Sequence, residues 1–262
     1  MAAESALRKV FLTGASAGIG LETARLLTAS GFEVWGTSRG VNRLPQLPAF
    51  HPVVMDLRQP SLPADVPFDV LISNAGAGVF GPLETLPAAL VREQLQILFE
   101  APLELIRQVL PGMRARGRGT IINVTSLAGV FPIPYMAAYS AWKAGLSALS
   151  ESLRMELAVT PIRVVDIRPG DINTRFYDSI QRIEGAPDQA RMARAWDTIT
   201  RNMRNAPPPA IVARAILRVL QSENPPPAVT VGGAFQAKLA PFAARLAPPR
   251  LREWALRRYY RL

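Results

Sequence analysis

The sequence predicts a single α/β domain, in which a doubly wound parallel sheet of about seven strands carries helices on both faces. Two observations lead to this fold class. Apolar runs and amphipathic runs alternate from end to end of the 262 residues, as strands and helices do in such a sheet. The apolar runs are nearly continuous rather than strictly alternating, which is typical of parallel strands covered on both faces. No internal repeat or interdomain linker interrupts the pattern, so residues 1–262 are predicted to form one domain.

The N-terminal half begins with a strand, because the apolar run over 9–13 leads into a glycine-rich turn. The helix after it, over 18–30, has apolar residues at helical spacing and ends at Gly31. Three more apolar runs are expected to form the strands 32–38, 51–56 and 68–74. A long helix is expected over 89–116, with Pro102 either bending it or marking its true start.

The C-terminal half continues the same alternation. Its strands are expected over 119–126, 162–170 and 228–233. An amphipathic helix over 137–158 follows the first of them, and one or two mobile helices over 174–205 follow the second. A further helix over 208–220 has prolines at its entrance, where the first turn of a helix tolerates them.

Composition excludes several kinds of site. The chain has no cysteine, which excludes disulfides, thiol nucleophiles, thiolate zinc sites and iron–sulfur clusters. His51 is the only histidine, so a multi-histidine metal site and a Ser-His-Asp triad elsewhere in the chain are excluded as well. No metal site is predicted, and any chemistry must use hydroxyls, carboxylates, amines or a cofactor.

The net charge is +10, and Lys9, Lys143 and Lys238 are the only lysines among 30 basic residues. Such a balance suits nucleic acid, an anionic membrane, a phosphate-bearing ligand or simply a solvated surface. The N-terminus has no apolar stretch of a signal peptide, and no run approaches the roughly 18 apolar residues of a membrane-spanning helix. A cytoplasmic protein is therefore expected.

The stretch "TGASAGIG" over 13–20 lies between the first strand and the first helix, where a dinucleotide-binding fold has its phosphate loop. Gly14 allows the tight turn, Gly18 lets the backbone approach a pyrophosphate, and Gly20 lets helix and strand pack closely. The helix amides and dipole then face the anion. The spacing is Gly-x3-Gly-x-Gly, which differs from the common G-x-G-x-x-G fingerprint.

Together with four other segments, this loop resembles the short-chain dehydrogenase/reductase family. The stretch "SNAG" over 73–76 matches its Asn-Asn-Ala-Gly motif, and "YSAWK" over 139–143 matches its Tyr-x3-Lys motif. Ser126, thirteen residues before that tyrosine, has the place of the catalytic serine, and "RPGDINT" over 168–174 matches a Pro-Gly-x3-Thr segment. The resemblance covers about 13–175. It implies a Rossmann-type fold, hydride transfer between a nicotinamide cofactor and an alcohol/carbonyl pair, and a homodimer or homotetramer.

The resemblance also implies a set of cofactor-binding residues. They are Gly14, Ser16, Gly18, Ile19, Gly20, Ser38, Arg39, Asp56, Leu57, Asn74, Ala75, Gly76, Tyr139, Lys143, Pro169, Gly170, Ile172 and Thr174.

The end of the second strand indicates which nicotinamide cofactor binds. An acid there binds the ribose of NAD, whereas an arginine favours the 2′-phosphate of NADP. This strand ends in Ser38 and Arg39 without an acid, which predicts NADP(H) unless Arg39 is only a surface arginine. Asp56 is either the family's contact to the adenine amine or a cap at a strand end.

Tyr139, Lys143 and Ser126 are the predicted catalytic residues. Hydride transfer to a carbonyl leaves an oxygen that needs a proton, and a tyrosine is the natural donor in a chain with one histidine. Residues i and i+4 share a helix face, so Lys143 lies beside Tyr139 and is expected to lower its pKa. In the family the lysine also holds the nicotinamide ribose, and the serine orients the substrate oxygen. Without the other motifs, the pair would be read as a buried tyrosine beside a snorkelling lysine.

One position departs from the family pattern. The family often has a catalytic asparagine on the helix before the fifth strand, and Leu98 stands at that position here. Leucine cannot bind the water through which the asparagine supports the lysine. Gln94 or Gln96 is a candidate substitute, and helical spacing does not decide between them. The departure leaves two interpretations, an enzyme with an altered proton relay or an NADP(H)-binding regulatory or scaffold protein with weak catalysis.

The substrate side is marked only by apolar residues. Those over 127–138, together with Phe176 and Tyr177 in the predicted lid 174–205, are expected to border the pocket. Such walls suit a hydrophobic alcohol, ketone or aldehyde and are similar to the steroid and retinol branch of the family. The same residues are also what core and lid packing would need.

The last segment, 233–262, is predicted to be a basic amphipathic extension. From Gly233 onward Glu253 is the only acid, whereas seven basic residues alternate with aromatic and aliphatic ones. Such a helix either makes peripheral contact with a membrane or packs on the domain or a partner subunit. Binding to nucleic acid is not expected, because no aromatic–basic module accompanies the charge.

Overall fold

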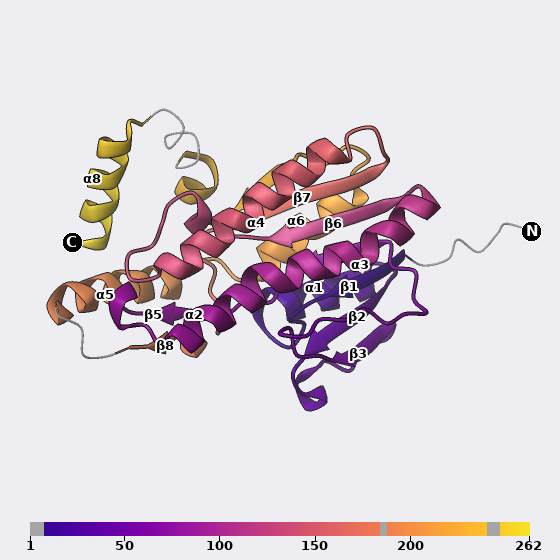
Figure 1. The fold of residues 1–262 in the computed structure, drawn as a ribbon, viewed down its shortest axis with the longest axis horizontal. Coiled ribbons are helices and arrows are strands. Elements are labelled where there is room, and N and C mark those ends of the chain that lie inside the picture. The colour runs from indigo at the N-terminus through magenta and orange to yellow at the C-terminus, as the bar shows by residue number, and fades with distance from the viewer. Residues whose placement is uncertain (1–7, 184–187, 240–246) are drawn as a thin grey trace, which may run out of the picture.

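The computed structural model describes residues 8–183, 188–239 and 247–262. Its centre is a seven-stranded parallel sheet with the strand order β3-β2-β1-β4-β6-β7-β9, which confirms the predicted fold class (Figure 1). The strands are β1 (Arg8–Leu12), β2 (Phe32–Ser38), β3 (Phe50–Val54), β4 (Val70–Ser73), β6 (Gly119–Val124), β7 (Ile162–Pro169) and β9 (Ala228–Val231). The order reverses between β1 and β4, and a ligand crevice forms at the carboxyl ends of parallel strands at such a point.

Helices cover both faces of this sheet. On one face α1 (Gly18–Ala29) packs beside α6 (Ala210–Gln221), and on the other lie α3 (Ala101–Arg116) and α4 (Ala137–Glu156) (Figure 1). Each face has its own apolar core, one built with α1 and α6 and the other with α3 and α4. Both faces of the strands are therefore buried, which explains why their sequences read as continuous apolar runs.

The long helix predicted over 89–116 is one continuous rod with a wide turn inside it. It consists of α2 (Ala88–Leu95), a π turn over Gln96–Glu100, and α3. Pro102 is the second residue of α3, directly after the π turn, where a proline costs little; the rod continues through it and begins earlier, at Ala88. Such π turns are rare and are often found at functional sites.

A smaller group of elements lies at one end of the molecule, on the left in Figure 1. It contains a two-stranded parallel sheet of β5 (Val79–Phe80) and β8 (Gln181–Arg182), together with α5 (Gln189–Arg204) and α8 (Pro249–Tyr260). A third apolar cluster holds this group together. The sequence predicted helix over 174–205 but not the small sheet, because two-residue strands carry no periodic signal.

Several boundaries also differ from the predictions. The strands expected over 51–56 and 68–74 are shorter, because their last residues turn into the loops at the carboxyl edge of the sheet and β4 begins two residues later than expected, at Val70. The predicted C-terminal extension is two pieces, a π turn over Phe235–Leu239 and α8, and residues 240–246 of it lie outside the described residues. Short 3₁₀ turns occur at Val41–Arg43, Leu83–Thr85, Leu127–Gly129 and Tyr177–Ser179.

In the described parts of the chain, no helix has the combination of length and apolar character that crossing a bilayer demands.

Candidate active site

A cavity of about 910 Å³ opens at the carboxyl ends of the strands. It brings together segments that are far apart in the sequence, including the glycine loop, the end of β2, the turn after β4, and the residues after β6 and β7. Of the predicted site residues, the following line it: Gly14, Ser16, Gly18, Ile19, Ser38, Arg39, Asp56, Leu57, Asn74, Ala75, Gly76, Ser126, Tyr139, Lys143, Pro169, Gly170, Ile172 and Thr174.

Gly20 is the predicted site residue that does not line the cavity. A Cβ at this position would stand 2.0 Å from the carbonyl oxygen of Gly14 and 2.7 Å from the side-chain nitrogen of Asn74. Its function is the close approach of α1 to the loop, as predicted from its place in the motif. Gly14 itself has a φ of +71°, a left-handed conformation that favours glycine.

Hydrogen bonds join the glycine loop to the turn after β4. The Thr13 hydroxyl accepts from the backbone N–H groups of Asn74 at 2.9 Å and Ala75 at 3.0 Å. The Asn74 amide donates to the carbonyl oxygens of Thr13 at 3.0 Å and Gly14 at 3.3 Å. These bonds hold the loop in an open cradle and leave the first amides of α1 free to meet an anion. The residues present therefore fit a dinucleotide pyrophosphate.

Basic residues gather at the far end of the cavity, beyond β2. Ser38 and Arg39 line it as predicted, and Arg43 and Arg58 line it too. Sequence reasoning missed Arg43 and Arg58, because neither belongs to a motif and the chain has many arginines. Asp56 accepts from the Arg58 backbone N–H at 2.9 Å and from its Nε at 3.0 Å, and these bonds lower the pKa of Asp56 to about 2. Asp56 thus caps a turn and also faces the cavity.

Lys143 is fixed in one position inside the cavity wall. The side chain is 4% exposed, and its Nζ donates to the carbonyl oxygen of Val124 at 2.8 Å. Burial lowers the pKa of Lys143 to about 8, and the charge of Asp166 opposes this effect. The ammonium can make three hydrogen bonds, so two donors are left for other groups.

Tyr139 and Ser126 lie in the same part of the cavity. Burial raises the pKa of Tyr139 to about 12, and a hydrogen bond with Ser126 partly opposes it. The prediction of a lowered pKa for Tyr139 is therefore wrong for this structure, because desolvation of the phenol outweighs the favourable interactions. The Ser126 Oγ accepts from the backbone N–H of Ala128 at 3.0 Å, so its own proton is available to Tyr139 or to a substrate oxygen.

The substrate side of the cavity differs in part from the prediction. Phe176 and Tyr177 line it, and the Phe176 ring centroid lies 5.8 Å from that of Tyr139. The segment 127–138 contributes no lining residue; its apolar side chains pack into the core around it instead. The apolar lining that the sequence did not predict is Val79, Leu90, Ile97 and Met203. Leu90 lies on α2, Ile97 in the π turn, Val79 on β5 and Met203 on α5. Tertiary packing brings these elements to the cavity.

The structure places the two candidate glutamines differently. Gln94 is 2% exposed, lines the cavity, and neither of its amide atoms has a hydrogen-bond partner among the described residues. Gln96 does not line the cavity. Leu98 is fully buried, also away from the cavity, so the position expected to carry an asparagine faces the core.

Comparison with known proteins agrees with this geometry. Residues 8–184 match the family model described as short chain dehydrogenase. The chain is 33% identical over 262 residues to 3-ketodihydrosphingosine reductase from Bacteroides thetaiotaomicron, covering 96% of this chain and 97% of that protein. The fold superposes on a short-chain dehydrogenase from Streptomyces avermitilis with a TM-score of 0.80 at 26% identity, covering 96% and 97% of the two chains.

A second solved structure holds a cofactor. It is a serine dehydrogenase complexed with NADP+, and it matches with a TM-score of 0.74 at 26% identity, covering 88% of this chain and 97% of that one. With a family model matching most of its length and a relative matching nearly all of it, this chain belongs to the short-chain dehydrogenase family.

Proposed function

We propose that this protein is an NADP(H)-dependent oxidoreductase that interconverts a hydrophobic carbonyl compound and its alcohol. One observation carries the proposal: Ser126, Tyr139 and Lys143 meet in the same cavity as the glycine loop. A hydroxyl donor, a phenol and an ammonium are thereby placed at one end of a space that fits a dinucleotide.

In the reducing direction, a nicotinamide held in this cavity would supply the hydride for the carbonyl carbon, and the protein's own residues handle the carbonyl oxygen. The Ser126 hydroxyl donates a hydrogen bond to the substrate oxygen and orients it. The Tyr139 phenol, whose pKa near 12 keeps it protonated at neutral pH, gives its proton to that oxygen. The Lys143 ammonium, on the same helix face, stabilises the phenolate that remains.

The choice of NADP(H) is supported by the basic end of the cavity. Arg39 offers a planar guanidinium to a 2′-phosphate, and Ser38 adds a hydroxyl. Arg43 lines the same region and adds positive charge, whereas the charge of Arg58 is already paired with Asp56. The serine dehydrogenase with NADP+ gives further support.

The substrate class follows from the lining and from the relative that matches nearly the whole chain. The walls contain Phe176, Met203 and Ile97, so a long apolar group fits. Gln94 is a polar group within this apolar side, suited to a hydroxyl or amino group near the reacting carbon. A long-chain amino ketone, the kind of substrate named for the Bacteroides relative, combines both features.

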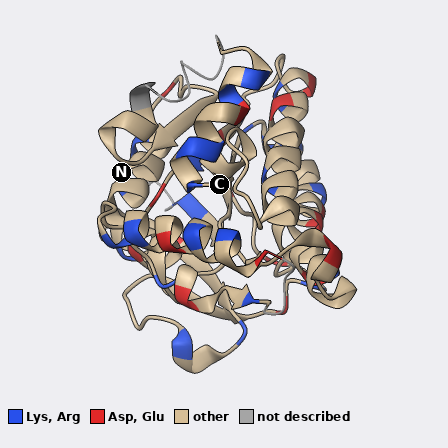
Figure 2. Ribbon diagram, turned by 90° about the vertical axis from the view of Figure 1, so that its left-hand side faces the viewer, with Lys and Arg blue, Asp and Glu red and all other residues tan. Residues whose placement is uncertain are grey.

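The outer surface suggests two associations. At the end of α4, Met155 is 70% exposed and Val159 is 96% exposed, which suits contact between copies in a homodimer or homotetramer. On α8, Leu251 and Trp254 are exposed beside several arginines, which suits peripheral contact with an anionic membrane. Figure 2 faces the end of the molecule that carries α5 and α8, and shows basic residues, in blue, along these two helices.

The test is steady NADPH oxidation by the full-length protein with a panel of ketones and aldehydes, including long-chain amino ketones and β-ketoacyl esters. Turnover that Tyr139→Phe abolishes, with NADPH affinity retained, supports the proposal. Tight NADPH binding without turnover on any substrate would support the regulatory or scaffold alternative, which relatives described as reductases and dehydrogenases do not favour.

A further inference from the structure

Asp166, on β7, is a buried carboxylate beside the proposed catalytic residues. It is 1% exposed and lies in a strand between β6 and β9. A carboxylate at such a place is costly unless it is paired and hydrogen-bonded. None of the motifs that identify the family includes this residue, so its presence needs a reason of its own.

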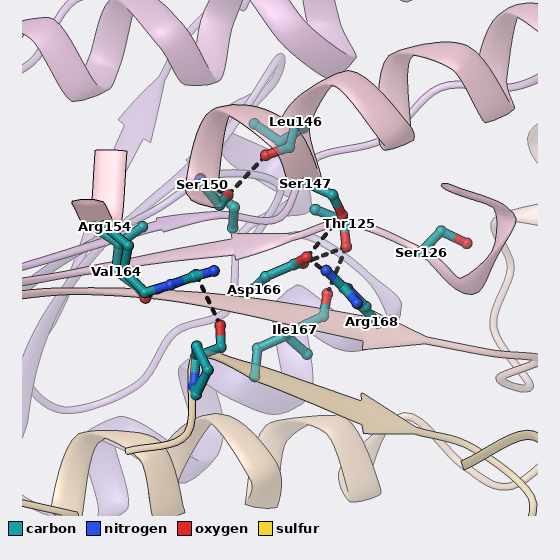
Figure 3. Close-up of polar contacts among 12 residues, drawn as sticks. Thr125, Ser126, Leu146, Ser147, Ser150, Arg154, Val164, Asp166, Ile167 and Arg168 are labelled. Carbon is teal, nitrogen blue, oxygen red and sulfur yellow. Dashed lines mark hydrogen bonds and ion pairs between the residues drawn. The ribbon is translucent and has the colours of Figure 1, made fainter. Parts of the chain in front are cut away.

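Three side chains donate to the Asp166 carboxylate (Figure 3). The Thr125 hydroxyl donates to Oδ1 at 2.5 Å, and the Ser147 hydroxyl donates to Oδ2 at 2.7 Å. Arg168 Nε makes an ion pair with Oδ2 at 2.7 Å. Both carboxylate oxygens are therefore engaged, and the group is held rigidly.

These partners adjoin the catalytic residues in the chain. Thr125 directly precedes Ser126, and Ser147 lies one helical turn after Lys143 on α4. Asp166 thus joins the end of β6 to the face of α4 that carries the lysine. Since Lys143 also donates to Val124, the two elements are tied together at two successive points.

The negative charge of Asp166 also acts on Lys143. Burial lowers the pKa of Lys143, and Asp166 is the group whose charge raises it. On α4 itself, Tyr139 is the neighbouring titratable group in the cavity. The charged side chains on the elements packed against α4 are Arg163, Asp166 and Arg168 of β7, Arg92 and Glu93 of α2, and Glu100 of the π turn. Arg92, Glu100 and Arg163 are exposed to solvent, and β6 carries no charged residue.

We propose that Asp166 is a positioning residue, which sets Ser126 and Lys143 in register and holds Lys143 in its ammonium form. The catalytic part of this statement rests on the proposed function. The effect on the Lys143 charge does not depend on turnover and can be measured directly.

The chain has only three lysines, so protein labelled with ¹³C at the lysine Cε gives a simple NMR titration. Lys143→Arg assigns the signal. In the wild type Lys143 is expected to titrate near pH 8. In Asp166→Asn the midpoint should fall by about one pH unit, so that the ammonium fraction above the wild-type midpoint is about tenfold smaller. In Asp166→Glu, which keeps the charge, it should stay close to the wild-type value.

Asp69→Asn is the matched control. Asp69 is also a buried aspartate paired with an arginine, Arg118, but it stands at the amino end of β4, away from the cavity. Its loss should lower the melting temperature without moving the Lys143 midpoint. A Lys143 midpoint in Asp166→Asn that coincides with the wild type, whatever happens to the melting temperature, overturns the proposal.

A second variant covers the case in which Asp166→Asn does not fold. Arg168→Gln removes the positive partner of Asp166, so the Lys143 midpoint should rise, and an unchanged or lower midpoint also counts against the proposal. Where turnover is found, the alkaline limb of kcat/KM should move with the NMR midpoint. If the wild type shows no turnover, only the proposed function fails, because the NMR titration still decides the proposal for Asp166.

Discussion

Gln94 and Leu98 lie four residues apart on one continuous helix, yet Gln94 lines the cavity and Leu98 is buried in the core. Residues at this spacing share a face in a regular α-helix. Here the π turn over Gln96–Glu100 widens the helix between them and changes that relation. This helix therefore gives Glu93 and Gln94 to the cavity, and the buried amide among them, Gln94, lies one turn before the position where the family pattern has its asparagine.

The first prediction concerns the Gln94 amide. Gln94→Met keeps the length of the side chain and removes two buried polar atoms that have no partner among the described residues. We expect the free energy of unfolding to rise by about 1 kcal/mol and kcat/KM to fall about tenfold. Urea unfolding and steady-state kinetics measure the two effects.

Gln96→Met is the control for this change, because Gln96 is on the same helix but does not line the cavity. It should leave kcat/KM unchanged. A Gln94→Met protein that is less stable than the wild type would show that the amide is well paired, and the assignment of Gln94 to the substrate side would then fail.

The second prediction is a pH dependence set by Lys143. Because its pKa is lowered to about 8, the ammonium is present below that pH and is lost as the pH rises through it. The pKa of Tyr139 is about 12, so the phenol stays protonated over the same range. We expect kcat/KM for carbonyl reduction, which reports the free enzyme, to fall above about pH 8. A rate that stays level up to pH 10 would contradict the role given to Lys143.

The third prediction separates the two nicotinamide cofactors at Arg39. Arg39→Ala should weaken NADPH binding by about tenfold to a hundredfold, the worth of charge-assisted hydrogen bonds to a phosphate, and leave NADH binding unchanged. Fluorescence titration gives both dissociation constants. Arg58→Ala is a useful comparison, since Arg58 is already paired with Asp56 and should matter less. Equal losses for NADPH and NADH would refute the assignment.

Motifs made the sheet and most of the site predictable, whereas residues brought in by tertiary packing were not. The glycine loop and the residues after β4, β6 and β7 lie at the ends of strands, and parallel strands bring those ends to one edge. Met203 and Val79 reach the cavity only because α5 and the small β5–β8 sheet pack at that end. The raised pKa of Tyr139 could not be predicted for the same reason, since its burial depends on neighbours that no local pattern reveals.

The fourth prediction concerns Gly20. An alanine Cβ there would stand 2.0 Å from the Gly14 carbonyl oxygen, a backbone atom that cannot move aside without opening the loop. We expect Gly20→Ala to cost about 3 kcal/mol or more of stability, and to abolish NADPH binding in whatever protein still folds. Gly40→Ala is the control, because a Cβ at Gly40 meets no atom within 4 Å. A Gly20→Ala protein with normal unfolding would disprove the packing argument.

The last prediction concerns the exposed face of α8. This helix packs on α5 through Leu256 and Tyr260, and hydrogen bonds from Arg194 and Asn202 hold its C-terminal end. Its opposite side leaves Leu251 53% exposed and Trp254 63% exposed, with arginines around them. Burying these two side chains in a lipid interface gains several kcal/mol, and the arginines add attraction to anionic lipids.

We therefore expect the full-length protein to float with vesicles that contain phosphatidylserine and to remain in solution with neutral vesicles. The double variant Leu251→Ser and Trp254→Ser should lose flotation yet nearly keep its melting temperature, because more than half of each residue is exposed to solvent. Point variants are sharper than truncation at residue 232, since truncation would also remove Tyr260 from the cluster beside the cavity. The companion change Val54→Ser removes an exposed apolar residue on β3, which lies away from α8 in Figure 1, and this variant should float like the wild type. Equal partitioning of wild type and double variant would rule out the membrane contact and leave a partner subunit as the cover for this face.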